Sequence, residues 1–194
     1  MSDRLLHSEQ QDPMISGPRP WWAWLAAAWG VLGVAGILVF AIVRLTPYAV
    51  AAVTSGMTAW QWVLMFFSMG FMAWSEGYRG FQCRFSPRVA ARALYLLLNP
   101  TLTRGLLAPV FCIGYFHARR RGLIAVWSGT LAIILLVLLV QLAEQPWRGI
   151  LDAGVVVGLS WGLASFLHMV YRTLREGRFQ RSPEAPSSDL HESH

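Results

Sequence analysis

The sequence predicts an all-α integral membrane protein with four transmembrane helices and a short helix pair between the second and third spans. Two features of the composition carry this prediction. Of the 194 residues 55% are hydrophobic, with a mean hydropathy of +0.44, and only 13% are charged. A soluble domain carries about a quarter charged residues. So little polar surface cannot cover this apolar mass in water, whereas a bilayer accommodates it.

Four apolar segments approach the ~20 residues that a helix needs to cross a bilayer. The first, 22–43, contains no charged residue, and the second, 59–75, is rich in Met, Phe and Trp. The third, 123–142, holds the most apolar run of the chain, and the fourth covers 153–171. We therefore predict one transmembrane helical domain over residues 21–176.

The region between the second and third spans predicts two short helices. A helix over 87–98 would begin after an N-cap at Ser86, with proline at its first position, and end before Asn99-Pro100. A second helix over 103–117 contains Pro109 and is too short to span. The pair could lie in the headgroup layer, or form a re-entrant hairpin with Asn99 near its tip. The apolar character of the second helix on all sides favours the hairpin.

The polar run Glu76-Gly77-Tyr78-Arg79-Gly80-Phe81-Gln82 follows the second span. Its two glycines predict that the helix ends there and that the chain folds back along the membrane surface.

The distribution of arginines predicts the topology. All 16 basic residues are arginine, and cytoplasmic loops carry an excess of positive charge. With both termini cytoplasmic and the short pair returning to the side it left, only Arg44 and Arg148 lie outside, and Arg104 is undecided. The arginines inside are Arg4, Arg19, Arg79, Arg84, Arg88, Arg92, Arg119, Arg120, Arg121, Arg172, Arg175, Arg178 and Arg181. A fifth span through 106–116 would divide the arginines almost evenly, so the sequence favours four.

Composition and charge also predict the cellular location of the protein and the kind of partner it binds. The polar tails, 1–20 and 177–194, predict disordered cytoplasmic segments of a bacterial inner-membrane protein. The net charge of +6 is carried by arginines that flank apolar segments. This pattern favours contact with anionic lipid headgroups and excludes a nucleic-acid role.

A ladder of small residues on the fourth span predicts close helix packing. Gly154, Gly158 and Gly162 are four residues apart and therefore lie on one helix face, where another backbone can approach closely. Small residues with matching spacing on the first span are Ala26, Gly30 and Gly33. The partner of the glycine face is the first span, a second copy of the chain or another membrane protein, and the sequence leaves these three open.

Four ionisable residues are predicted to meet near the cytoplasmic ends of the spans: Glu76, Arg79, His117 and His168. As a site, Glu76 would act as acid or base, Arg79 would hold an anion, and Glu76 with the two histidines would bind a metal or carry protons. Alternatively these groups hydrate in the headgroup layer, and Glu76 pairs with Arg79. No two histidines share a helix at ligand spacing, so we assign no cofactor.

The sulfur-containing residues offer a weaker candidate. Met65, Met69 and Met72 form one stripe of the second span, and thioethers bind Cu(I) and haem iron. A methionine stripe at helical spacing is more typical of adaptable core packing, which we expect here. Cys83 and Cys112 show no metal-ligand spacing, and we expect two thiols.

Two further expectations concern contacts between distant segments. Trp29 and Trp161 lie deeper than an aromatic belt, which predicts packing between helices. If the short pair is re-entrant, Arg104 would approach Glu144 or Asp152 on the outer side.

Three classes of function follow from these features. The first is a non-enzymatic accessory, assembly or scaffold protein that uses its helix-packing faces. The second is a membrane-embedded enzyme that acts on a lipid or isoprenoid at the cytoplasmic face through the four ionisable residues. The third is a small oligomeric transporter or channel, for which the broken helix pair is the main support. The absence of a catalytic motif favours the first class.

Overall fold

The computed structural model describes residues 20–99, 101–115 and 120–176. Helices make up about 90% of the structure, and the described residues include no strand, which confirms the all-α class. The predictions for the two tails and for His117 fall outside the described residues.

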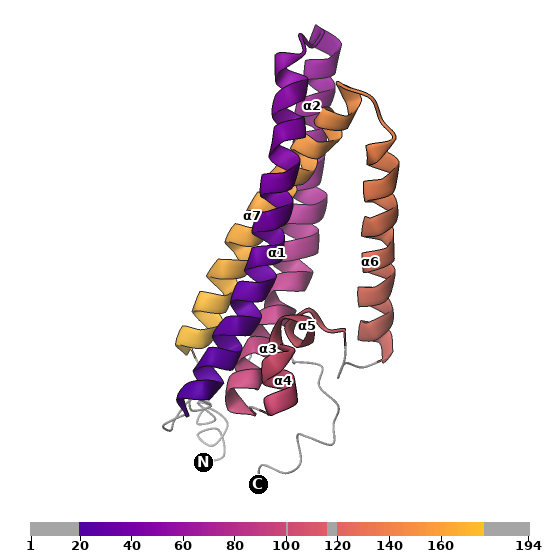
Figure 1. The fold of residues 1–194 in the computed structure, drawn as a ribbon. Helices are drawn as coiled ribbons and strands as arrows, with labels where there is room; N and C mark the ends of the chain where they lie inside the picture. The colour runs from indigo at the N-terminus through magenta and orange to yellow at the C-terminus, as the bar shows by residue number, and fades with distance from the viewer. Residues whose placement is uncertain (1–19, 100, 116–119, 177–194) are drawn as a thin grey trace, which may run out of the picture.

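The helices form an up-and-down arrangement in which α1 begins and α7 ends at the same end of the molecule (Figure 1). We call this end the base, and the opposite end, with the turn at residues 55–58, the tip. In chain order the elements are α1 (Trp21–Thr54), α2 (Ala59–Met72), the π-helix η1 (Ala73–Phe85), α3 (Ser86–Leu98), α4 (Leu102–Leu106), α5 (Ala108–Ile113), α6 (Arg120–Gln141) and α7 (Trp147–Glu176).

Two of these helices, α1 and α7, are long and apolar enough to cross a membrane by length and composition. The helix α2 is shorter, and the apolar part of α6 covers Val126–Gln141. The structure thus supports membrane-spanning dimensions for two of the four predicted spans. The arrangement with four spans stays a prediction.

The packed body of the molecule is built around α7, which contacts α1, α2, η1 and α3. Its main core joins α1, α3, α5 and α7 toward the base. Every residue of α3 from 89 to 97 is buried, so this helix has no solvated face. An amphipathic helix lying in the headgroup layer would expose one face, and α3 does not.

The helix predicted to end at Gly77 and Gly80 does not end there, and this prediction is wrong. The chain stays helical from α2 through η1 into α3, and it becomes a π-helix over the polar segment. Gly77 is a packing site and not a helix stop, because a Cβ there would lie 2.9 Å from the Cβ of Trp161. Ser86 does begin α3, but its hydroxyl is buried without a hydrogen-bond partner and caps nothing.

The short helices lie at the base rather than as a hairpin directed into the middle of the bundle. Because α3 continues the descending η1, its end at Asn99 points away from the centre. Leu94 and Leu97 pack against Ala23 and Ala27 in the first turns of α1. The predicted second helix is divided into α4 and α5, with the break at Leu107, two residues before Pro109.

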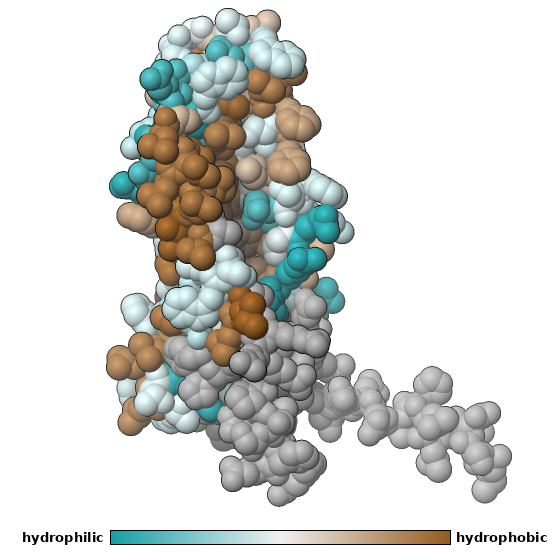
Figure 2. All heavy atoms as spheres, turned by 90° about the vertical axis from the view of Figure 1, so that its right-hand side faces the viewer, coloured by the Kyte–Doolittle hydropathy of each residue, from teal (hydrophilic) through white to brown (hydrophobic). Residues whose placement is uncertain are grey.

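The helix α6 stands apart from this body (Figure 1). Near the base, the hydroxyls of Tyr115 and Thr130 share a hydrogen bond of 2.7 Å, and the Tyr115 and Trp127 rings meet edge to face at 5.3 Å. Beyond these contacts its apolar side chains are exposed, and Figure 2 shows a continuous hydrophobic surface on this side. The exposed residues are Leu131, Ile133, Ile134, Leu135, Leu136, Val137, Leu138 and Leu139.

Candidate functional site

The glycine face of α7 packs within the chain, against α2 and η1. Gly154 lies against Ser68, and a Cβ at Gly158 would lie 3.0 Å from the carbonyl oxygen of Met72. A Cβ at Gly162 would overlap the ring of Phe81. The expected kind of contact is present, but its partner is the second helical segment and not α1. The sequence could not choose, because a small-residue face accepts any helix of suitable shape.

The matching small residues of α1 meet the short helices instead. At Gly30 a Cβ would lie 2.9 Å from the sulfur of Cys112. Gly33 lies against the ring of Pro109, and Ala26 faces Gly105 of α4. The Trp29 indole adds a hydrogen bond, donating to the carbonyl oxygen of Leu106 at 3.3 Å. The predicted role of Trp29 in helix packing is therefore confirmed.

The contact between η1 and α7 is reciprocal. Trp161 of α7 covers Gly77, and Phe81 of η1 covers Gly162. The Trp161 indole also donates a hydrogen bond to the side-chain oxygen of Gln82 at 3.0 Å. Each large ring thus sits over a glycine of the opposite helix, which fixes η1 in one register along α7.

Contacts along α7 give the height of Glu76 between tip and base. Below the tip, Gly149 lies against Tyr48 and Ala52, in the last two turns of α1 before the turn at residues 55–58. Glu76 lies beside Gly158, which is nine residues, or about 14 Å, further toward the base. Further down, the ring of Phe85 packs against Phe166 with ring centroids 6.3 Å apart. The polar part of η1 therefore follows the middle of α7, not its end.

The exposed apolar run of α6 covers the same height. Its lower end is fixed by Gly114, where a Cβ would lie 3.6 Å from Val126, and by Tyr115 at Thr130. Its upper end leads through residues 142–146 into the tip at Gly149. The eight exposed side chains between 131 and 139 thus bracket the level of Glu76. The expectation that Glu76 and Arg79 lie at the cytoplasmic end of a span stays a prediction.

Glu76 and Arg79 are both exposed at this height. Glu76 forms no ion pair or hydrogen bond with the described residues, and it does not pair with Arg79. The Arg79 guanidinium lies 5.2 Å from the centroid of the Trp74 ring. Two exposed charges beside an apolar belt therefore call for a partner or for water.

The structure does not bring Glu76 and His168 together. His168 is exposed and lies ten residues beyond Gly158 on α7, about 15 Å further toward the base than Glu76. His117 lies outside the described residues. Among the residues the structure describes, no three His, Cys, Asp or Glu side chains gather as a metal site would require. The role of the four residues as a site stays a prediction.

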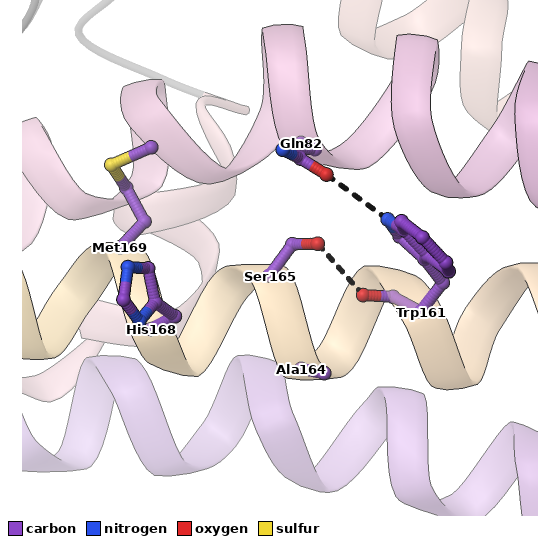
Figure 3. Close-up of a pocket in the computed structure, with 6 residues that line it drawn as sticks. All are labelled: Gln82, Trp161, Ala164, Ser165, His168 and Met169. Atoms are coloured by element: carbon purple, nitrogen blue, oxygen red, sulfur yellow. Dashed lines mark hydrogen bonds between the residues drawn. The ribbon is translucent and has the colours of Figure 1, made fainter.

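His168 does line an open pocket of about 390 Å³ between η1 and α7 (Figure 3). Its lining residues are Gln82, Trp161, Ala164, Ser165, His168 and Met169. The Ser165 hydroxyl donates to the carbonyl oxygen of Trp161 at 2.9 Å, and Gln82 accepts from the Trp161 indole. An amide, a hydroxyl and an imidazole thus border a mainly apolar hollow. Sequence inspection had not singled out Gln82 as part of such a group, because it comes from a different helix.

A buried arginine at the base was also missed. Arg92 of α3 is 4% exposed, donates to the carbonyl oxygen of Phe111 at 2.9 Å, and lies 5.3 Å from that residue's ring centroid. Phe111 is in the last turn of α5, where carbonyls lack helical partners and a cation is favourable. Burial raises the pKa of the nearby Cys112 thiol to about 12, against the opposing effect of Arg92.

The predicted approach of Arg104 to Glu144 or Asp152 is wrong. Arg104 belongs to α4 at the base, where it lies 5.6 Å from the ring centroid of Tyr95. Asp152 is near the tip and forms an ion pair with Arg148 at 3.6 Å. Because the short helices do not re-enter the bundle, nothing carries Arg104 across it.

The sulfur residues behave as packing elements where the structure describes them. Met65 is buried with Ile150 and Ala153, and Met69 packs against that cluster. Met72 faces Gly154 and Gly158. This confirms the expected packing role of the methionine stripe. Cys83 is exposed and Cys112 is buried, and neither forms a disulfide.

Comparison of the chain with protein-family models, curated proteins and solved structures gives no match in any of the three.

Proposed function

We propose that the chain is a four-span protein of the bacterial inner membrane, with both termini cytoplasmic, that serves as a non-enzymatic accessory or assembly subunit. The spans would be α1, α2 with the first part of η1, α6 and α7. In this placement the base faces the cytoplasm. Arg104, undecided by sequence, joins the arginines at the base, as the positive-inside rule requires.

One observation carries the proposal: a well-packed body presents two surfaces that its own side chains do not cover. One is the exposed apolar run of α6, and the other is the pair of exposed charges on η1. Lipid tails can cover the first, but they offer no counter-charge for the second. An accessory subunit that binds another protein would use the apolar run of α6 and the charges of η1 as contact surfaces.

The membrane placement is tested by thiol labelling from either side of the membrane. In a Cys83→Ser, Cys112→Ser background, Ser55→Cys and Gln145→Cys mark the tip, and Glu176→Cys marks the base. An impermeant maleimide should label the two tip variants from the periplasm and the base variant only in inverted vesicles. Labelling of all three from one side would overturn the four-span placement.

The subunit role is tested by photo-cross-linking in intact cells. A photoreactive residue at Leu136 on α6 should give discrete protein adducts, while the same residue at Leu25, which is exposed on α1 near the base, serves as control. Adducts to lipid alone at both positions would contradict the proposal.

The pocket beside His168 favours a second candidate, a protein that binds or modifies a lipid. Hydrogen-bonding groups of Gln82, Ser165 and His168 border an apolar hollow, as lipid headgroup sites do. His168→Ala and Ser165→Ala should then reduce binding of a photoactivatable phospholipid. Unchanged lipid labelling in both variants would leave the accessory role alone.

A further inference from the structure

We propose that two copies of the chain pair across η1, so that the Glu76 carboxylate of each copy meets the Arg79 guanidinium of the other. The inference rests on the proposed membrane placement and names the partner of the charged surface. That partner is a second copy of this chain.

The heights of the two residues make this pairing possible. A two-fold axis of a membrane dimer runs along the bilayer normal, because both copies share one topology. Residues therefore meet residues of equal height across the axis. Glu76 and Arg79 are three residues apart, within a single turn of η1, and so lie at nearly one height.

The charges complement each other only in the paired state. Within the described residues Glu76 has no ion-pair partner, and Arg79 contacts the Trp74 ring at 5.2 Å. In a self-complementary interface, one contact repeated by symmetry satisfies both copies and gives two ion pairs. An anionic lipid headgroup would suit Arg79 but repel Glu76.

The backbone next to Arg79, at Gly80, permits a close approach. A Cβ at Gly80 would meet, within 4 Å, only the Ser75 carbonyl and the Glu76 side chain of its own turn. Small residues at a helix crossing allow backbones to approach in a membrane. Phe71 and Trp74, each at least half exposed, precede Glu76 on the tip side and supply apolar contact area.

Charge reversal in the full-length chain tests the pairing. The chain is reconstituted in phosphatidylcholine bilayers, which carry no anionic headgroup, and dimerisation is followed by single-molecule photobleaching against protein density. Glu76→Arg and Arg79→Glu should each weaken dimerisation at least about tenfold, since each places like charges across the axis. The double variant Glu76→Arg/Arg79→Glu should recover to within about threefold of the parent, because the swapped pair is again self-complementary.

Recovery in the double variant is the decisive result, since neither a lipid contact nor a different protein with fixed charges would restore pairing. Arg172→Glu, which breaks an exposed ion pair with Glu176 away from η1, is the control and should leave dimerisation unchanged. A monomeric parent, unchanged single variants or a double variant that stays monomeric would each overturn the inference.

Failure of the pairing and failure of the membrane placement give different results. If the thiol-labelling pattern holds while the parent is monomeric, the four-span placement stands and the dimer does not. Unaltered thermal unfolding of the three η1 variants verifies that lost dimerisation does not arise from misfolding. A loss of folding in Glu76→Arg is checked with Glu76→Gln, which should weaken dimerisation without placing a cation beside α7.

Discussion

The helices α6 and α7 are both long and apolar, yet one stands apart and the other organises the molecule. Between residues 131 and 139, α6 consists only of Leu, Ile, Val and one Ala. On α7 a glycine recurs at 154, 158 and 162, and each glycine receives a side chain or the backbone of α2–η1. Apolar character suits both helices to a bilayer, but small residues set which of them packs within the chain.

The largest effect should come from filling the α7 groove. Gly162→Leu would place a side chain in the position of the Phe81 ring, and the two helices would have to separate. We expect a loss of several kcal/mol, or no folded protein, because overpacking costs about 1–3 kcal/mol even where the backbone can shift. Gly70→Leu is the matched control, since Gly70 has open space around it. Thermal unfolding in detergent measures both, and equal melting temperatures would contradict the α7–η1 packing.

The next largest difference is expected between the stability losses caused by truncating a leucine at the base and a leucine on α6. Leu96 of α3 is fully buried, and Leu96→Ala should destabilise the protein by about 2–5 kcal/mol through the cavity it leaves. Leu136 of α6 is 46% exposed, and Leu136→Ala should change stability by less than about 0.5 kcal/mol. Denaturant titration of the detergent-solubilised chain compares them. A comparable loss at Leu136 would mean that α6 packs on the body.

Replacing two glycines of α1 with alanine should change the free energy of unfolding in opposite directions. Gly33→Ala brings a methyl group against Pro109, and we expect a loss of about 1–3 kcal/mol. Gly36→Ala meets nothing within 4 Å and should gain up to about 1 kcal/mol from helix propensity. The difference between their melting temperatures reports the contact of α1 with α5. Equal shifts of the two melting temperatures would contradict the packing of α5 against α1.

The smallest effect is expected at the ion pair near the end of α7. Arg172 and Glu176 meet at 2.7 Å, but both side chains are substantially exposed. Arg172→Met should change the free energy of unfolding by no more than about 0.5 kcal/mol, because solvent screens such pairs. Arg92→Met, which removes a buried hydrogen bond, should cost clearly more in the same measurement. If the two variants were equally stable, the buried role of Arg92 would be wrong.

The all-helical character and the small-residue faces were predictable from the sequence, since both depend on residue type and spacing along one helix. The partners of those faces were not. Gly158 and Gly30 each signal a close contact, but whether it is with α2–η1 or with α5 depends on how the helices meet in space. The same holds for the pocket, whose Gln82 and His168 come from different helices.

The sequence alone determined that this chain is helical and apolar, with arginines concentrated beside its hydrophobic segments, because composition and periodicity are local properties. The tertiary structure decided where the polar segment of η1 lies. Gly77, one of the two glycines that predict a helix end, became a packing site, since Trp161 occupies the space above it. The helix therefore continues, and it leaves Glu76 at the height of the apolar run of α6, well away from His168.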